Sequence, residues 1–260
     1  MEYVVICTVA LLVSGLTLYS GFGLGTLLMP AFALFFPLPV AVAATAIVHL
    51  ANNFFKIFLV GRKADGGVVL RFGLPAMVAA LFGAALLNWF AYLPPLTTYE
   101  LGDSIHEITT VKVVIGVVIV GFALVDLLPR FKNLAFDRKY LPLGGGLSGF
   151  FGGLSGNQGA LRSAFLIKAG LDKEAFIGTG TVSAVMVDVA RLLVYGLSFF
   201  VLSFSAVENI AGLVLAATLA AFLGAFLGAR MLKKVTLRTV QLIVGAMLIL
   251  AGLGMMVGLL

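Results

Sequence analysis

Apolar stretches separated by short polar loops run along almost the whole chain. Six of them have the length that a helix needs to cross a bilayer, about 20 residues. These stretches are 40–61, 74–93, 111–129, 175–199, 208–231 and 239–259. The pattern predicts an all-α polytopic membrane protein.

Two further apolar regions do not fit a single span. Residues 3–37 are too many for one crossing, because a helix of that length would run about 50 Å at 1.5 Å per residue. Glycines interrupt this region at 21–25, and they interrupt residues 141–170 at 152–159. We therefore expect each region to form two short helices joined at a break, which we call a helix hairpin.

The composition supports a chain that lies in the membrane. Of 260 residues, 62% are hydrophobic and 11% are charged, whereas a soluble domain has about a quarter charged residues. No soluble catalytic domain is therefore expected, and the net charge of +6 indicates the topology of the spans and not a nucleic-acid surface.

The single cysteine, Cys7, excludes an intrachain disulfide. No G-x-x-x-x-G-K-[ST] loop is present, and we expect no cofactor, no metal and no nucleotide motor.

Charge predicts the orientation of the spans. One topology puts 13 of the 17 basic residues on a single face, which the positive-inside rule makes cytoplasmic. These 13 are Arg62, Lys63, Arg71, Arg130, Lys132, Arg138, Lys139, Lys168, Lys173, Arg230, Lys233, Lys234 and Arg238. The other face receives Glu2, Glu100, Asp103, Glu107 and Glu208, with Lys112 close by. We expect a multi-pass protein of the cytoplasmic (inner) membrane with both termini on the outer, periplasmic side.

This topology implies two inverted repeats. Residues 1–130 form the first repeat and residues 141–260 the second, each with one hairpin and three spans, about ten helical segments in all. The hairpin at 3–37 enters from the outside and the hairpin at 141–170 from the cytoplasm. A weak alignment of residues 23–32 with 156–165 agrees with this arrangement. Inverted repeats with broken helices are a transporter architecture that permits alternating access.

Four segments carry a resemblance to a known family. They are Ser-Gly-Leu-Thr-Leu-Tyr-Ser-Gly-Phe-Gly-Leu-Gly-Thr at 14–26, Gly-Phe-Phe-Gly-Gly-Leu-Ser-Gly-Asn-Gln-Gly-Ala-Leu-Arg at 149–162, Gly-Leu-Asp-Lys-Glu-Ala-Phe-Ile-Gly-Thr at 170–179, and Asp-Val-Ala-Arg-Leu at 188–192. Through them the chain resembles the TauE/SafE family of sulfite exporters over essentially its whole length. The resemblance implies outward transport of sulfite, organosulfonates or related anions without ATP, either facilitated or coupled to an ion.

The two hairpin breaks are the first candidate binding elements. Helix starts supply free backbone N–H groups and a partial positive charge, and glycine lets an oxyanion approach the backbone. The candidates are Gly23, Gly25 and Thr26 at the first break and Gly156, Asn157, Gln158 and Gly159 at the second. Arg162 lies one turn beyond the second break, where its guanidinium could bind an oxyanion in a bidentate way. The alternatives are that the glycines only permit close helix packing and that Arg162 reaches the cytoplasmic rim.

A polar stripe lies on the first long span. His49, Asn52, Asn53 and Lys56 have the spacing i, i+3, i+4, i+7, with Thr45 one turn earlier. We expect His49, Asn52 and Asn53 to bind the solute, and Thr45 and Lys56 to have a gating or structural role. The alternative is interhelical hydrogen bonding alone. His49 could carry a proton if transport is coupled to protons.

The matching span of the second half has its own polar residues. Asp188 and Arg191 are three residues apart and could pair. We expect them, with Thr179 and Ser183, to be gating or structural residues, because a bare carboxylate would repel an anion.

Three other functions stay open. A passive anion channel shares buried arginines and dipole-lined sites. An intramembrane serine protease is suggested by Gly153-Leu-Ser155-Gly156, but both histidines, His49 and His106, precede Ser155. A purely structural membrane subunit would not explain mid-span His49, Asp188 and Arg191. The sequence leaves homodimerisation and the coupling ion undecided.

Overall fold

The computed structural model describes residues 1–260 except 21–23, 61–62, 103, 129, 131–133, 199–209 and 232–236. Within the helices, the side chains of residues 17–20, 26, 59–60, 126, 197–198, 229, 231, 237–241 and 243 also lie outside the description. Candidate Gly23 is therefore not described, and for Thr26 only the backbone is.

Ten helices of eight or more residues make up most of the described chain. They are α1 (Glu2–Ser20), α2 (Gly25–Ala33), α3 (Leu38–Val60), α5 (Leu74–Ala91), α6 (Thr110–Leu127), α7 (Leu141–Ser155), α8 (Gly159–Leu166), α9 (Lys173–Ser198), α11 (Ile210–Met231) and α12 (Leu237–Met256). Short α4 (Gly66–Val68) and the π-helical turn η2 (Val69–Gly73) lead into α5, and the 3₁₀ turn η4 (Arg138–Tyr140) leads into α7. The predicted helical membrane protein is confirmed.

Four helices in the described part of the chain are long and apolar enough to span a membrane. They cover Leu38–Phe58, Gly66–Ala91, Lys173–Gly196 and Ile210–Gly228. Shorter apolar helices cover Glu2–Leu16, Thr110–Val125 and Val244–Met256. The helix bounds lie within a few residues of the six predicted spans, except that the second span begins earlier, at Gly66.

Both long apolar regions are broken where glycines interrupt the sequence. In the first helix hairpin, α1 ends at Ser20 and α2 begins at Gly25. In the second, α7 ends at Ser155 and α8 begins at Gly159. Gly156 caps α7 with φ +77°, a left-handed conformation that glycine adopts without a steric penalty.

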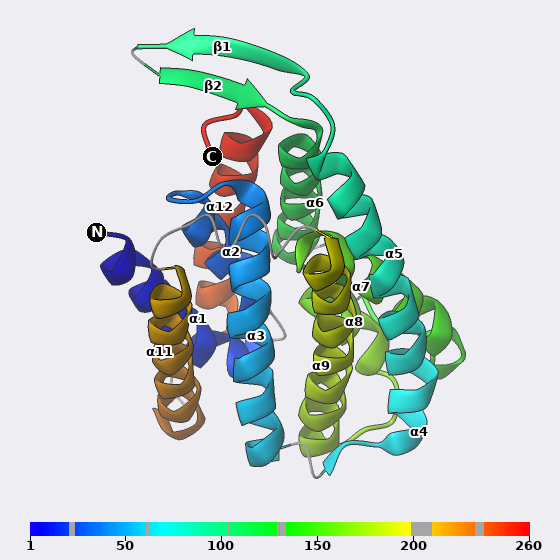
Figure 1. Cartoon of the computed structure of the whole chain (residues 1–260). Coiled ribbons are helices and arrows are strands. Elements are labelled where there is room, and N and C mark those ends of the chain that lie inside the picture. The colour runs from blue at the N-terminus through cyan, green and yellow to red at the C-terminus, as the bar shows by residue number, and fades with distance from the viewer. Residues whose placement is uncertain are drawn as a thin grey trace.

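The helices pack crosswise, in the sense that each helix hairpin lies along a long helix from the other half of the chain (Figure 1). α7 of the second hairpin packs along α5, and α1 of the first hairpin packs along α11. α3 lies against α9 at the centre, and α6 lies against α12. Glycines permit the two hairpin contacts: a Cβ on Gly153 would collide with the carbonyl of Ala80, and a Cβ on Gly224 with that of Leu11.

A small β-hairpin corrects the prediction of an all-α fold. Strands β1 (Thr97–Leu101) and β2 (Ser104–Ile108) pair antiparallel, with Tyr99 opposite His106. The Tyr99 hydroxyl donates to the carbonyl of Val257 at 2.6 Å, so the β-hairpin is tied to the end of α12. Sequence reasoning treated this segment as an acidic loop and overlooked its β-branched and aromatic residues, which favour strands.

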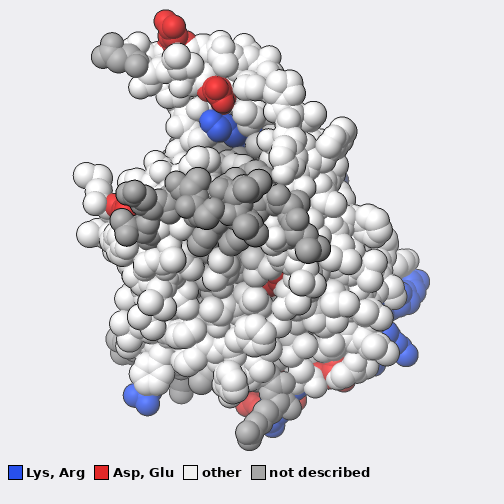
Figure 2. Space-filling model, in the orientation of Figure 1, with Lys and Arg blue, Asp and Glu red and all other residues white. Residues whose placement is uncertain are grey.

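Charge is distributed unevenly between the two ends of the helix bundle. Figure 2 shows Lys and Arg side chains mainly at the end opposite the β-hairpin, and acidic side chains on the β-hairpin itself. Basic residues among those described lie at helix ends or in the short turns beside them: Lys63 follows α3, Arg71 lies in η2, Arg138 in η4, Lys168 follows α8, and Arg230 lies in the last turn of α11. We call the two ends of the bundle the basic end and the β-hairpin end.

Candidate functional site

The tips of the two helix hairpins meet inside the bundle. A Cβ placed on Gly25, the first residue of α2, would lie 3.5 Å from the carbonyl oxygen of Gly156. It would lie 3.6 Å from Cγ2 of Thr45 and 4.0 Å from Cδ2 of His49. Both hairpin breaks therefore converge on the same part of α3.

Gly156 makes room for an arginine at this meeting point. A Cβ at Gly156 would lie 2.8 Å from Nη1 of Arg191. Arg191 is 1% exposed, so its guanidinium is held between α9 and the tip of the second hairpin. Any other residue at position 156 would be strained by its positive φ and would crowd this guanidinium.

A single carboxylate joins the two halves of the chain. Asp188 Oδ2 accepts from His49 Nδ1 at 2.6 Å and from Asn53 Nδ2 at 3.1 Å, and both donors lie on α3. Asp188 Oδ1 is paired with Arg191 Nη2 at 2.8 Å on its own helix. The pair that the spacing suggested is present, and the bonds to His49 and Asn53 are additional.

Several buried donors around the hairpin tips have no hydrogen-bond partner among the described atoms. They include Asn52 Nδ2, Asn157 Nδ2, Gln158 Nε2, Arg162 Nη1, Arg191 Nε and the hydroxyl of Thr45. Leaving a buried polar group unsatisfied costs about 1–3 kcal/mol. The starts of α2 and α8 add backbone N–H groups without helical partners. The meeting point is therefore rich in donors that a bound oxyanion could satisfy.

The ionisable groups around the tips carry an excess of positive charge. Lys56 and Arg191 are buried, and Arg162 is partly buried with Nη1 enclosed. Asp188 is the one buried acidic side chain among those described. These cations outnumber the one carboxylate, and a bound anion would compensate the excess positive charge.

Arg162 reaches the interior from the first turn of α8. Its N–H donates to the carbonyl of Gln158 at 3.0 Å, so the residue belongs to the helix that starts at the break. Its side chain crosses to α9, where a Cβ on Gly180 would lie 3.4 Å from Arg162 Nε. Its Nη1 is enclosed and has no hydrogen-bond partner among the described atoms.

A family comparison agrees with this geometry. The family model described as sulfite exporter TauE/SafE matches residues 4–255, nearly the whole chain. The chain belongs to the TauE/SafE family. Searches of curated proteins and of solved structures each found no match. Membership in this family of transporters makes the chain a multi-pass membrane protein that carries an anion.

Some predicted residues of this TauE/SafE protein lie at the tips and others do not. Thr179 accepts the N–H of Asp65 at 2.9 Å, so it holds the loop before α4 and does not face the tips. Ser183 lies beside Gly73 of η2. Asn52 Oδ1 accepts from Ser14 of α1 at 3.2 Å, which leaves only its amide nitrogen for a solute.

The second hairpin tip is held by hydroxyl groups. Ser148 Oγ donates to the carbonyl of Gln158 at 3.2 Å. Ser155 Oγ donates to the carbonyl of Phe151 at 3.0 Å and accepts the N–H of Asn157 at 3.3 Å. Ser155 therefore closes a turn. Neither histidine pairs with Ser155 among the described contacts, because His49 bonds to α9 and Asn53, and His106 lies on β2.

Three contributing residues were missed from the sequence: Ser14, Ser148 and Tyr195. Tyr195 is 4% exposed, and its hydroxyl donates to the carbonyl of Gly153 at 2.7 Å. It lies four residues after Arg191 on the same face of α9. That spacing could have identified Tyr195, whereas nothing in the spacing of Ser14 or Ser148 indicates their partners.

Proposed function

We propose that this protein is a secondary transporter that exports a small sulfur oxyanion, sulfite or an organosulfonate, across the cytoplasmic membrane by alternating access. Gly25, Gly156, Asn157, Gln158 and Arg162 would form the binding site. His49 and Asn53 of α3 would hold this binding site in position through their hydrogen bonds to Asp188. Membership in the family indicates an anion as the solute. The identity of the anion, the direction of transport and the alternating-access mechanism are our proposal.

One observation supports the proposal most strongly: unpaired donors and excess positive charge meet where the two hairpin tips touch. A sulfur oxyanion presents several acceptor oxygens, and it needs many donors in a medium of low dielectric constant. The guanidinium of Arg162, with Nη1 unpaired, suits such an anion. Asp188 Oδ2 accepts from His49 and Asn53, and Oδ1 lies 2.8 Å from Arg191 Nη2, so the charge of Asp188 is compensated before any anion arrives.

The crosswise packing supports two inverted repeats. In the proposed repeat α1 corresponds to α7, and α5 corresponds to α11. The contact of α5 with α7 then matches the contact of α11 with α1, and α3–α9 and α6–α12 are pairs of equivalent helices. Such a pseudo-twofold relation would let one half rock against the other around a central site.

Counterflow in proteoliposomes tests the function. Vesicles loaded with unlabelled sulfite should accumulate labelled sulfite, and sulfate, thiosulfate, taurine and acetate should compete to different extents. Arg162→Gln should reduce the rate at low sulfite by about a hundredfold, because charged hydrogen bonds in a buried site are worth about 1.5–3 kcal/mol each. Lys168→Gln is the matched control, since this exposed lysine lies just beyond the same helix at the basic end. Equal rates in the two variants would remove Arg162 from the site.

The same measurement separates a carrier from a passive channel. A carrier shows saturable exchange that is accelerated by solute on the opposite side, whereas a channel shows flux that does not depend on solute there. Linear, unaccelerated flux in the native protein would favour the channel.

We also propose a proton as the coupling ion, held at His49 and Asp188. Their 2.6 Å bond connects the two halves, so the loss of a proton there would change the contact between them. His49→Gln should make sulfite flux insensitive to an imposed pH gradient while counterflow continues. A gradient effect that persists in His49→Gln would place the coupling elsewhere.

A further inference from the structure

Tyr195 lies between the central site and the β-hairpin end. It follows Arg191 by one turn of α9, on the side toward the β-hairpin end. Its hydroxyl donates to the carbonyl of Gly153, near the tip of the second hairpin. The phenol therefore connects α9 to the hairpin element that carries the proposed binding groups.

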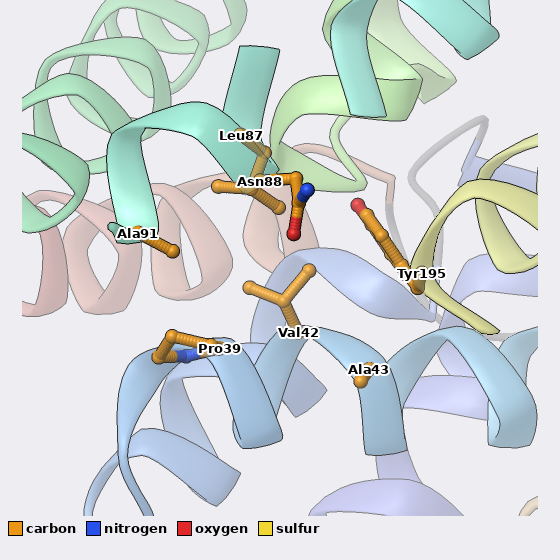
Figure 3. A pocket seen from close by; sticks show the side chains of 7 residues that line it. All are labelled: Pro39, Val42, Ala43, Leu87, Asn88, Ala91 and Tyr195. Atoms are coloured by element: carbon orange, nitrogen blue, oxygen red, sulfur yellow. The ribbon is translucent and has the colours of Figure 1, made fainter. Parts of the chain in front are cut away.

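A cavity lies beyond Tyr195 (Figure 3). Its lining comes from α3, α5 and α9, namely Pro39, Val42, Ala43, Leu87, Asn88, Ala91 and Tyr195. Its volume is about 10 Å³, close to the least that a single water needs. In this conformation an oxyanion larger than water cannot pass through the cavity.

Asn88 has an unused acceptor in the cavity that Tyr195 also lines. Its Oδ1 is buried and has no hydrogen-bond partner among the described atoms. Figure 3 shows the Asn88 amide and the Tyr195 hydroxyl directed toward the same space. A phenol has one O–H to donate, and here that donor satisfies Gly153 and leaves Asn88 unsatisfied.

We propose that Tyr195 and Asn88 form the gate of the solute path at the β-hairpin end. With the hydroxyl on Gly153, the gate is closed and the second hairpin is fixed to α9. When the hydroxyl moves to Asn88 Oδ1, the hairpin tip is released and the cavity joins the central site. Because each state satisfies one carbonyl acceptor and leaves the other, the two states are close in free energy and a passing anion can shift them. This inference rests on the proposed transport path.

Cysteine accessibility tests the gate without measuring transport. In a Cys7→Ser background, Thr45→Cys places a thiol at the central site. A membrane-impermeant maleimide is added on the β-hairpin side, which Ser104→Cys on the exposed β2 identifies. The labelling rate is measured with native Tyr195, with Tyr195→Phe and with Asn88→Leu.

The two substitutions should act in opposite directions. Tyr195→Phe removes the hydrogen bond to Gly153 but keeps the ring. The Thr45→Cys thiol should therefore label about three- to tenfold faster, a factor that corresponds to the net free energy of one hydrogen bond. Asn88→Leu removes the alternative acceptor, so labelling should slow by a similar factor. Ser104→Cys on the exposed β2 should label equally in all three proteins.

Unchanged rates, or rates that shift in the same direction, would overturn the gate. If Tyr195→Phe does not fold, judged by its elution volume and Tm, the Asn88→Leu protein decides alone, and unchanged or faster labelling there is contrary to the gate. Absence of saturable counterflow together with the expected labelling would reject the proposed transport and leave the gate in place.

Discussion

The two halves of the chain have the same sequence of elements but different polar residues at the centre. The first half contributes imidazole and amide groups through His49 and Asn53 of α3. The second half contributes the charges of Arg162, Asp188 and Arg191. In the proposed function the roles divide accordingly: the second half carries most of the buried charge, with Lys56 of α3 as the exception, and the first half provides His49 and Asn53 as neutral groups that would orient the anion.

The division depends on how the oxygens of Asp188 are shared. Oδ1 pairs with Arg191 on the same helix, and Oδ2 accepts from His49 and Asn53 on the opposite half. One carboxylate therefore neutralises a charge within its own half and joins the halves to each other.

The largest expected effect comes from removing that carboxylate charge. Asp188→Asn leaves Arg191 as an uncompensated buried cation, and breaking a buried pair in this way costs about 3–5 kcal/mol. The free energy of unfolding in mixed micelles, measured by denaturant titration, should fall by that amount. Asp137→Asn is the control, because this exposed carboxylate lies 4.0 Å from Lys168 and should change stability by less than about 1 kcal/mol. Similar losses in both proteins would contradict the role of Asp188.

The second test asks whether the two hairpins are packed in the same way. Gly153→Ala pushes α7 from α5, and Gly224→Ala pushes α11 from α1, because each added Cβ meets a backbone carbonyl. Each substitution should lower the free energy of unfolding by about 1–3 kcal/mol, the usual cost of overpacking. Gly146→Ala, whose Cβ would meet nothing within 4 Å, is the matched control on α7. A loss at only one of the two glycines would show that the hairpins are not equivalent.

The smallest effect concerns single hydroxyl groups. Ser14→Ala removes the donor to Asn52 Oδ1 and Ser148→Ala the donor to the Gln158 carbonyl. Each should cost about 1 kcal/mol of unfolding free energy. Only Ser148→Ala should also weaken sulfite counterflow, because Ser148 holds the tip that would contact the anion. Equal weakening by both would show that the first hairpin binds as strongly as the second.

Much of the fold was predictable because apolar length and glycine breaks are local signals. The break at Gly156 was visible as a glycine-rich interruption, and α3 and α9 differ by only a few residues from the predicted spans. The β-hairpin was not predicted, because an acidic stretch between two apolar spans resembles an ordinary loop. The three spans and one hairpin of each proposed repeat stay a prediction.

The candidate site was predictable only in part. The stripe that begins at Thr45 follows from helical spacing, and so does the pairing of Asp188 with Arg191. The bond between His49 and Asp188 joins residues 139 positions apart, and one sequence contains no information about such a distance. The role of Thr179 was given only as gating or structural, and its partner, the backbone N–H of Asp65 at 2.9 Å, lies 114 positions away, where helical spacing gives no guidance.

The β-hairpin has a mechanical consequence. Tyr99 and Lys112 of the first half hold the carbonyls of Val257 and Gly258 at the end of the second half, beside the close contact of α6 with α12. In the proposed alternating access, this connection would place the pivot of the rocking motion at α6 and α12. The elements farthest from these two helices would then move the most.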